Sequence, residues 1–224
     1  MKSTTRLAVI ALLAAFVSAA SFGCAYALAT ANDSGSTEIV SREIPWDDST
    51  SLTLGVRSTV RYVQTQGPGK VIARGPHRSV STLLVDHGDI RDQLLHTGAT
   101  LEITVFAPAI SSFRLNGNSR LGIEAYDQPR LFIAAEGSAV VDAAGRAGEV
   151  SIEMQGRSIV NLSRLEANAA SARIKGTSAL VMAPAQRATL DVRNFASAVL
   201  LTRPETLSTA LQDSGRVVDA HRKP

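Results

Sequence analysis

The sequence predicts an all-β protein built as a parallel β-helix, or β-solenoid, with about 20 residues in each coil and a less regular N-terminal half. Three observations support this fold class. Apolar and polar residues alternate with a period of two, which is typical of strands. A corner residue, usually Gly, recurs every 18 to 20 residues. The apolar positions keep the same spacing from each corner, as the stacking of equivalent units requires.

The repeat extends from Phe113 to Asp219. Its predicted corners are Gly117, Gly137, Gly156, Gly176, Asn194 and Asp213. These residue types tolerate the left-handed backbone angles of a sharp corner. The side chain two residues before each corner is apolar, and so is the one four residues after it. The residue immediately before each corner is always polar: Asn116, Glu136, Gln155, Lys175, Arg193 and Gln212.

A single unit of strand, corner, strand and loop cannot bury its apolar face, whereas stacked units bury a continuous stripe. We therefore expect Ile152 and Ile174 to face inward, and Gln155 and Lys175 to face outward. The alternative is an antiparallel sandwich with a strand about every 8–12 residues. A sandwich has no reason to keep one register through six units, so the solenoid is favoured.

Stacking also places equivalent residues of successive coils about 4.8 Å apart. In the row three residues before the corners, Glu153, Arg173 and Asp191 alternate in charge, which is mildly favourable. In the row just before the corners, Lys175 and Arg193 are adjacent and alike in charge. These five residues are the candidate ligand-binding residues. For Lys175 and Arg193, a solvated face is the simpler interpretation and an anion site the alternative.

The composition fits a narrow aliphatic core and argues against a nucleic acid partner. Apolar residues make up 45% of the 224 residues and aromatic residues only 4%, so we expect a core of Val, Ile, Leu and Ala. The formal charge is +3, but without Lys2 and Arg6 of the leader described next, 21 basic residues face 20 acidic ones. No cluster of Lys and Arg with interleaved aromatic residues is present.

Residues 1–29 have the pattern of a secretory signal peptide, and residues 30–37 are expected to form a flexible mature N-terminus. Lys2 and Arg6 precede an apolar, Ala-rich stretch. Three small-x-small cleavage sites follow, at Ala25–Ala27, Ala27–Ala29 and Ala29–Ala31. The alternative is an uncleaved anchor, because the 23 residues from Leu7 to Ala29 are just long enough to span a bilayer. Membrane contact is expected only through such an uncleaved leader.

Cys24 is the only cysteine, so no intrachain disulfide is possible and the fold depends on packing alone. Gly23-Cys24 is similar to a lipoprotein cleavage site, although Ser21 and Phe22 replace the usual aliphatic and small residues. The two interpretations are lipid attachment at Cys24 and removal of Cys24 with the leader.

Residues 38–219 are expected to form one domain, followed by a tail at 220–224. The N-terminal part is strand-like without the strict period, as in the terminal cap of a solenoid. Its expected strands are Leu52 to Tyr62, Val71 to Ala73, Val80 to Val85 and Leu101 to Val105. The segment Ile90 to His96 has a weak helical pattern. Trp46, the sole tryptophan, is interpreted as a plug for the end of the core, with a sugar-stacking platform as the alternative.

The sequence contains no cluster with catalytic or metal-binding spacing. No two of the four histidines pair at ligand spacing: His77, His87, His96 and His221. Asp86-His87-Gly88-Asp89 could touch a cation, but a polar turn is the simpler interpretation. A nucleophile elbow and a phosphate-binding loop are also missing. We therefore expect no metal, no cofactor and no enzymatic activity.

Several segments carry a family resemblance. They are Arg42 to Pro45, Leu52 to Tyr62, Leu101 to Val105, Phe113 to Gly117, and the Gly-x-Ser corners at Gly117, Gly156 and Gly176. Together they cover roughly residues 38–219, which resemble the putative auto-transporter adhesin head domain family, also called the head GIN domain. The resemblance implies a right-handed parallel β-helix exported by a bacterium, with a role in cell adhesion and no catalytic residues. Only Ala220 to Pro224 follow Asp219, so self-transport is not expected of this sequence.

Three functions are compatible with these observations. The first is an exported, non-catalytic scaffold for adhesion or binding at the cell surface or envelope, with a surface polymer or protein as partner. The second is a periplasmic, envelope-associated structural protein. The third is a lyase-like enzyme for acidic polysaccharides, because some right-handed β-helices gather acidic and basic residues on one sheet, as Glu153, Arg173 and Asp191 would do. The first is favoured because the outward side chains are long, polar and mixed in sign.

Overall fold

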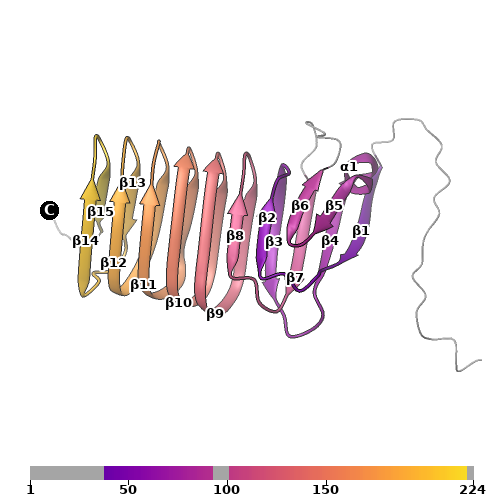
Figure 1. Ribbon diagram of the computed structural model, residues 1–224, viewed down its shortest axis with the longest axis horizontal. Coiled ribbons are helices and arrows are strands. Elements are labelled where there is room, and N and C mark those ends of the chain that lie inside the picture. The colour runs from indigo at the N-terminus through magenta and orange to yellow at the C-terminus, as the bar shows by residue number, and fades with distance from the viewer. Residues whose placement is uncertain (1–37, 93–100, 221–224) are drawn as a thin grey trace, which may run out of the picture. The chain divides into compact units, whose positions relative to one another are not determined.

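The computed structural model describes residues 38–92 and 101–220. It contains a β-solenoid of about five turns with stacked coils about 20 residues apart, which confirms the predicted fold class (Figure 1). The expectations for the leader and for Cys24 lie outside the described residues, as do His96 and His221.

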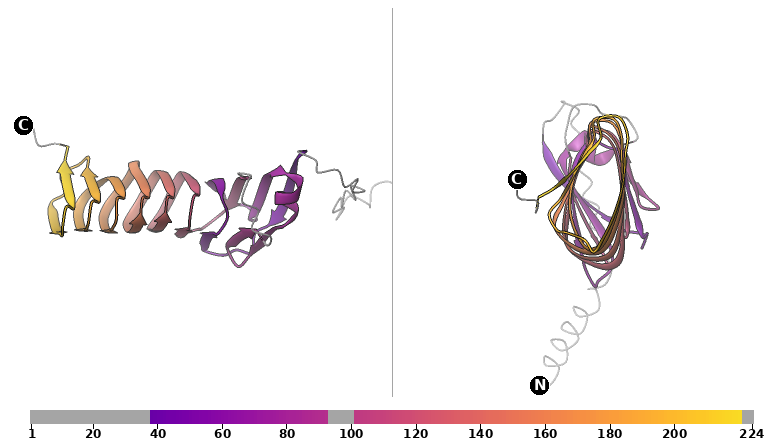
Figure 2. Two further views of the ribbon diagram at one scale, coloured as in Figure 1. Left: turned by 90° about the horizontal axis from the view of Figure 1, so that it is seen from above. Right: turned by 90° about the vertical axis from the view of Figure 1, so that its left-hand side faces the viewer.

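The regular coils begin at β8 and end at β15. Their strands are β8 (Ser112–Leu115), β9 (Arg120–Gly137), β10 (Val140–Gly156), β11 (Ile159–Ile174), β12 (Ala179–Val192), β13 (Ser197–Leu200), β14 (Thr206–Leu211) and β15 (Arg216–Asp219). Neighbouring strands pair in parallel, with residues about one repeat apart lying opposite each other. Viewed along the stack, the coils superimpose as a flattened loop (Figure 2).

The flattened loop has two long sides, which we name after their last strands. The β14 side consists of β8, the second halves of β9 to β12, and β14. The β15 side consists of β3 (Ser58–Gln64), the first halves of β9 to β12, β13 and β15. Each of β9 to β12 therefore bends and contributes to both sides.

Side chains alternate between the interior and the outer surface, as the sequence pattern predicts. Ile152 is 1% exposed and Ile174 is fully buried, whereas Gln155 and Lys175 are exposed. The expected inward and outward assignments are therefore confirmed. The interior of the regular coils is largely aliphatic and Ala-rich, which suits a loop whose two sides lie close together.

All six corner residues have positive φ angles. The four glycines have φ between 79° and 90°, while Asn194 and Asp213 have φ of 60° and 57°. The stacking is also tight at Gly137, Gly156 and Gly176. A Cβ added to Gly156, for example, would lie 2.6 Å from the carbonyl oxygen of Gly137. Gly thus satisfies both the backbone conformation and the close approach of the preceding coil.

The serine of each Gly-x-Ser corner is buried, and its hydroxyl bonds to backbone carbonyl groups. The Ser158 hydroxyl lies 3.2 Å from the carbonyl oxygens of both Ala135 and Gln155. The Ser178 hydroxyl donates to the carbonyl of Gly156 in the preceding coil. These serines are therefore structural, since a buried hydroxyl without a partner would be destabilising.

The N-terminal end of the solenoid is closed by antiparallel strands. β1 (Ile39–Pro45) pairs with β4 (Lys70–Pro76), which pairs with β7 (Leu101–Ala107). β7 pairs in parallel with β3, and β3 pairs with β9 of the first regular coil. On the β14 side, β2 (Ser51–Leu54) joins β8 to β6 (Asp89–Asp92), which forms a hairpin with β5 (Leu83–Asp86).

Three expectations for this N-terminal part were wrong. The segment expected as one strand, Val80 to Val85, contains the end of helix α1 (His77–Ser81) and the start of β5, because the helix packs against β1 and β4. The start of the segment expected as a helical turn, Ile90 to His96, belongs to strand β6, where it pairs with β2 and β5. The segment expected as one strand, Leu52 to Tyr62, is divided into β2 and β3 by a corner at 55–57.

Trp46 belongs to the core at this end, as the favoured interpretation requires. It is only 5% exposed, and its indole nitrogen donates to the carbonyl of Ser49. Its ring packs closely on Gly69, where an added Cβ would lie 2.7 Å from the Trp46 Cβ. A buried indole is not available for stacking on a sugar.

Candidate functional site

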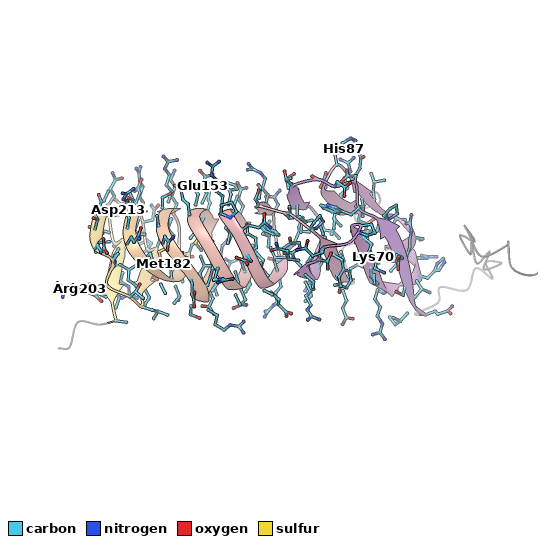
Figure 3. All side chains as sticks on the ribbon, turned by 90° about the horizontal axis from the view of Figure 1, so that it is seen from below. Lys70, His87, Glu153, Met182, Arg203 and Asp213 are labelled. Atoms are coloured by element: carbon cyan, nitrogen blue, oxygen red, sulfur yellow. The ribbon has the colours of Figure 1, made fainter. Side chains whose placement is uncertain are left out.

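The five candidate residues lie on the outer face of the β14 side, where successive coils bring them together. Glu153 of β10 lies opposite Arg173 of β11, which lies opposite Asp191 of β12. Lys175 and Arg193 follow these strands directly and occupy the next outward row. Figure 3 shows Glu153 on the outside of the coils.

The first contact in the row of alternating charge is an exposed ion pair. Arg173 Nη1 lies 3.7 Å from Glu153 Oε1, and their side chains are 74% and 52% exposed. Such a pair contributes little to folding because water screens both charges. Both side chains are therefore able to exchange this contact for a contact with a ligand.

Arg193 forms the tightest contact of the set, and its partner is on its own strand. Its Nε and Nη2 donate to the two carboxylate oxygens of Asp191 at 2.8 and 2.7 Å. This hydrogen-bonded guanidinium lowers the pKa of Asp191, and the positive charges of Lys175 and Arg173 lower it further. The carboxylate in turn raises the pKa of Arg193. The carboxylate of Asp191 thus offsets the like charges of Lys175 and Arg193.

Two shallow hollows flank the row. The first, about 250 Å³ in volume, includes Glu153, Arg173 and Lys175 in its lining together with Arg114 and Glu136. The second, about 210 Å³, is lined by Glu153, Arg173 and Asp191, with Ser and Thr residues beside them. Arg193 lines neither of these two hollows. The structure therefore brings four of the five candidate residues to a pair of adjoining hollows.

A row of small hydroxyl side chains runs beside the charged row. Ser151, Ser171 and Thr189 come from successive coils and occupy equivalent outward positions. They line the second hollow. Hydroxyls both donate and accept hydrogen bonds, so the two hollows offer positive, negative and neutral polar groups at the spacing of the strands.

Arg114 and Phe132 were not among the sequence candidates. The Arg114 guanidinium carbon lies 4.8 Å from the centre of the Phe132 ring, in a cation–π contact at the edge of the first hollow. The signal was present in the repeat, because Arg114 has the same position relative to its corner as Glu153 and Arg173. The register then places Arg114 opposite Ala134, beside Phe132.

The remaining titratable candidates do not gather. His87 and Gly88 have positive φ angles at the tip of the β5–β6 hairpin, and the His87 ring lies 2.6 Å from Oδ1 of its neighbour Asp86. Within residues 38–92 and 101–220, no group of three or more His, Cys, Asp or Glu could hold a metal ion. In the same part of the chain, no helix has the length and hydrophobicity needed to cross a membrane.

The comparison with known families decides the affiliation. The sequence profile of the family described as "Putative auto-transporter adhesin, head GIN domain" matches residues 81–204, which is more than half of the chain. The chain belongs to this family. The resemblance inferred from the motifs is therefore confirmed.

Solved structures share the fold of this head GIN domain at low sequence identity. A putative adhesin from Bacteroides fragilis is 15% identical with a TM-score of 0.65, and the match covers 82% of this chain and 97% of that one. A putative adhesin from Parabacteroides distasonis is 12% identical with a TM-score of 0.50, and the match covers 82% and 97%. These likenesses concern the fold alone. No curated protein matches the chain.

Proposed function

We propose that the protein is an exported, non-catalytic scaffold that binds an extended polymer or a protein surface through the outer face of its β14 side. The observation that carries the proposal is the pair of adjoining hollows in which Glu153, Arg173, Asp191 and Lys175 gather from three successive coils. A repeating face of this kind suits a ligand whose own charged and hydroxyl groups recur along its length.

Several features of the site favour binding over catalysis. Catalytic groups are usually held in a pocket and have pKa values close to neutrality. Here Asp191, the carboxylate that is hydrogen-bonded to Arg193, has a lowered pKa and is therefore a weaker base than an ordinary carboxylate. Glu153 and Arg173 are more than half exposed, so neither is held rigidly. Many weak contacts, screened by salt, fit these properties better than a single reaction centre.

The proposal that the protein is exported rests on the leader pattern and on the family's description as an adhesin. Protease treatment of intact cells separates the two possible locations. Degradation of the protein would support adhesion at the cell surface, whereas protection until the outer envelope is opened would support a periplasmic, envelope-associated structural role.

Binding should be measured against acidic polysaccharides and envelope preparations with single variants of the site. We expect Arg173→Ala and Lys175→Ala each to weaken binding by no more than about tenfold, since each removes one exposed contact. Arg61→Ala is the matched control, because Arg61 is also an exposed, ion-paired arginine and lies on the β15 side. The control should bind like the wild type, and binding should weaken as salt is added.

The same incubations test the enzymatic alternative. Unsaturated-product absorbance and polymer length are followed over time with the wild type and with Asp191→Asn. Turnover that this one substitution abolishes would overturn the scaffold proposal in favour of a polysaccharide lyase. Equal binding by all site variants would indicate that the binding surface does not lie on the β14 side.

A further inference from the structure

Within the described residues, the stack of coils ends at β14 and β15 (Figure 1). Among the described strands, β14 pairs only with β12, and β15 pairs only with β13. Leu207 and Leu211 of β14 are 46% and 50% exposed, although the residues opposite them in β12, Ala188 and Val192, are fully buried. The apolar side chains that continue the inward row are therefore partly exposed in the last coil.

Among the residues that the structure describes, nothing gives the edge of β14 the usual protection against pairing. Its sequence, TLSTAL, has no charge and no proline, and its register with β12 is unbroken. Soluble proteins normally protect edge strands with charges, proline, bulges or a covering element. The edge strand at the opposite end has such protection, because β1 contains Arg42, Glu43 and Pro45 and contacts helix α1.

The backbone of β14 directs a defined set of groups to this edge. The amide of Gln212 donates to the carbonyl of Val192 in β12. In a parallel strand, the amide and carbonyl of one residue point to the neighbouring strand on one side, and those of the next residue point to the other side. Ser208 and Ala210 therefore face β12, while Leu207, Thr209 and Leu211 direct their amides and carbonyls to the open edge.

These three residues are self-complementary. The row Leu207, Thr209, Leu211 is the same in both directions about Thr209. An antiparallel second strand centred on Thr209 places Leu207 opposite Leu211 of the second copy and Thr209 opposite its equivalent. All three amides and carbonyls then exchange hydrogen bonds, and the leucines cover each other on the inward face.

The other side of the coil is compatible with the same arrangement. The amide of Arg216 donates to the carbonyl of Ala196 in the preceding coil, so Val217 directs its backbone groups to the open edge. Thr209 and Val217 lie four residues before and four residues after the corner at Asp213. A two-fold axis perpendicular to both sides can therefore pass through both residues.

We propose that two copies of the chain associate end to end through β14 and β15, about a two-fold axis that passes through Thr209 and Val217. The two interiors then form one continuous apolar core. Assembly stops at two copies because the contact is symmetric and the opposite end is closed by β1 and α1. This interface is separate from the outward rows of the proposed binding surface.

The first test measures the mass of the whole protein in solution by size exclusion with light scattering over a range of concentrations. We expect twice the mass of the polypeptide. Thr209→Lys places two like charges at the axis and should raise the dissociation constant at least about 100-fold. Ser208→Lys is the matched control on the outward face of the same strand and should remain a dimer. Both residues are exposed in the single copy, so both variants should unfold as single copies at the same denaturant concentration.

The second test reports the register. In a Cys24→Ser background, Thr209→Cys supplies one thiol per chain at the axis, where opposed Cα atoms are about 5.5 Å apart, within the range of a disulfide. Mild oxidation should link the two copies, whereas Ser208→Cys should link poorly because its equivalents are not opposed. A wild-type monomer at all concentrations, open-ended polymers, a dimeric Thr209→Lys variant, or equal linking by both thiols would each overturn the proposal.

Discussion

Replacing Gly156 by alanine should destabilise the protein far more than replacing Gly117 by alanine. Both glycines have positive φ, 90° and 79°, which costs an alanine about 1 kcal/mol at either position. An added Cβ at Gly117 meets nothing within 4 Å. At Gly156 it would lie 2.6 Å from the carbonyl oxygen of Gly137 and 3.1 Å from its nitrogen. The preceding coil must then move.

The additional loss of stability at Gly156 has two sources, the close contact itself and a hydrogen bond of the preceding coil. Overpacking a close contact costs about 1–3 kcal/mol. The same Gly137 carbonyl accepts a 2.6 Å hydrogen bond from the amide of Arg157, and weakening this bond adds about 1 kcal/mol. We therefore expect a loss of about 3–5 kcal/mol for Gly156→Ala and about 1 kcal/mol for Gly117→Ala. Urea unfolding with unchanged m values provides the measurement. Equal losses would show that the backbone conformation alone requires Gly and that coil stacking is not limiting.

Three further predictions concern the register, the charged row and the leader. Ile152→Asp buries a carboxylate in the aliphatic interior and should lower the free energy of unfolding by several kcal/mol. Gln155→Asp on the outer face should change it by less than about 1 kcal/mol. Equal shifts in denaturant midpoint would contradict the register. Arg193 lowers the pKa of Asp191, so their pairing stabilises the fold above the ordinary Asp pKa of 3.8 and this stabilisation is lost as the pH falls through the lowered value. Arg193→Gln should therefore reduce the denaturant midpoint at about pH 7, and this reduction should become smaller as the pH falls below 3.8; a deficit of the same size at about pH 7 and at about pH 2 would refute this reasoning. The exported chain should begin between Leu28 and Asn32, which its intact mass reports; a start at a lipid-bearing Cys24 or retention of Met1 to Ala27 would exclude the cleavage sites inferred from the sequence.

The regular coils could be predicted because every repeat has apolar and polar residues at the same distances from its corner. Side chains such as Ile152 and Ile174 keep their distance from a corner residue, and stacking converts that distance into register. The N-terminal part has no repeated pattern of this kind. Residues 54, 56 and 58 continue the buried alternation through the corner between β2 and β3, so the pattern conceals the break. No Gly, Asn or Asp with positive φ marks that corner in the way that Gly117 marks the next one.

Helix α1 could not be predicted because its cause lies elsewhere in the chain. The helix has five residues, and Val80 within it also fits the alternation of a strand. Short helices gain little from their own sequence and depend on packing. Here the packing comes from β1 and β4, strands whose pairing is not visible in a local pattern.

For the candidate site, the sequence predicted which residues gather and that Glu153 pairs with Arg173, but it missed the bond between Arg193 and Asp191. Glu153, Arg173 and Asp191 lie opposite one another because they share a position relative to their corners. Arg193 was considered only with its neighbour in the adjacent coil, Lys175. Residues two apart on a strand share a face, so the bond from Arg193 to Asp191 on its own strand was available from the same pattern.

The pairing of β3 with β9 has a consequence for how the chain folds. Thr59 lies opposite Arg120, so this pairing closes a loop of about 60 residues, whereas Ser112 and Phe132 in the first regular coil are only 20 apart. Loop-closure entropy makes the pairing of β3 with β9 about 1 kcal/mol less favourable than the closure of one regular coil. Nucleation is therefore favoured within the regular coils, and each further coil pairs with its neighbour at the same entropic cost. Coils could be added to or removed from the β14 end over evolution without raising the barrier to folding.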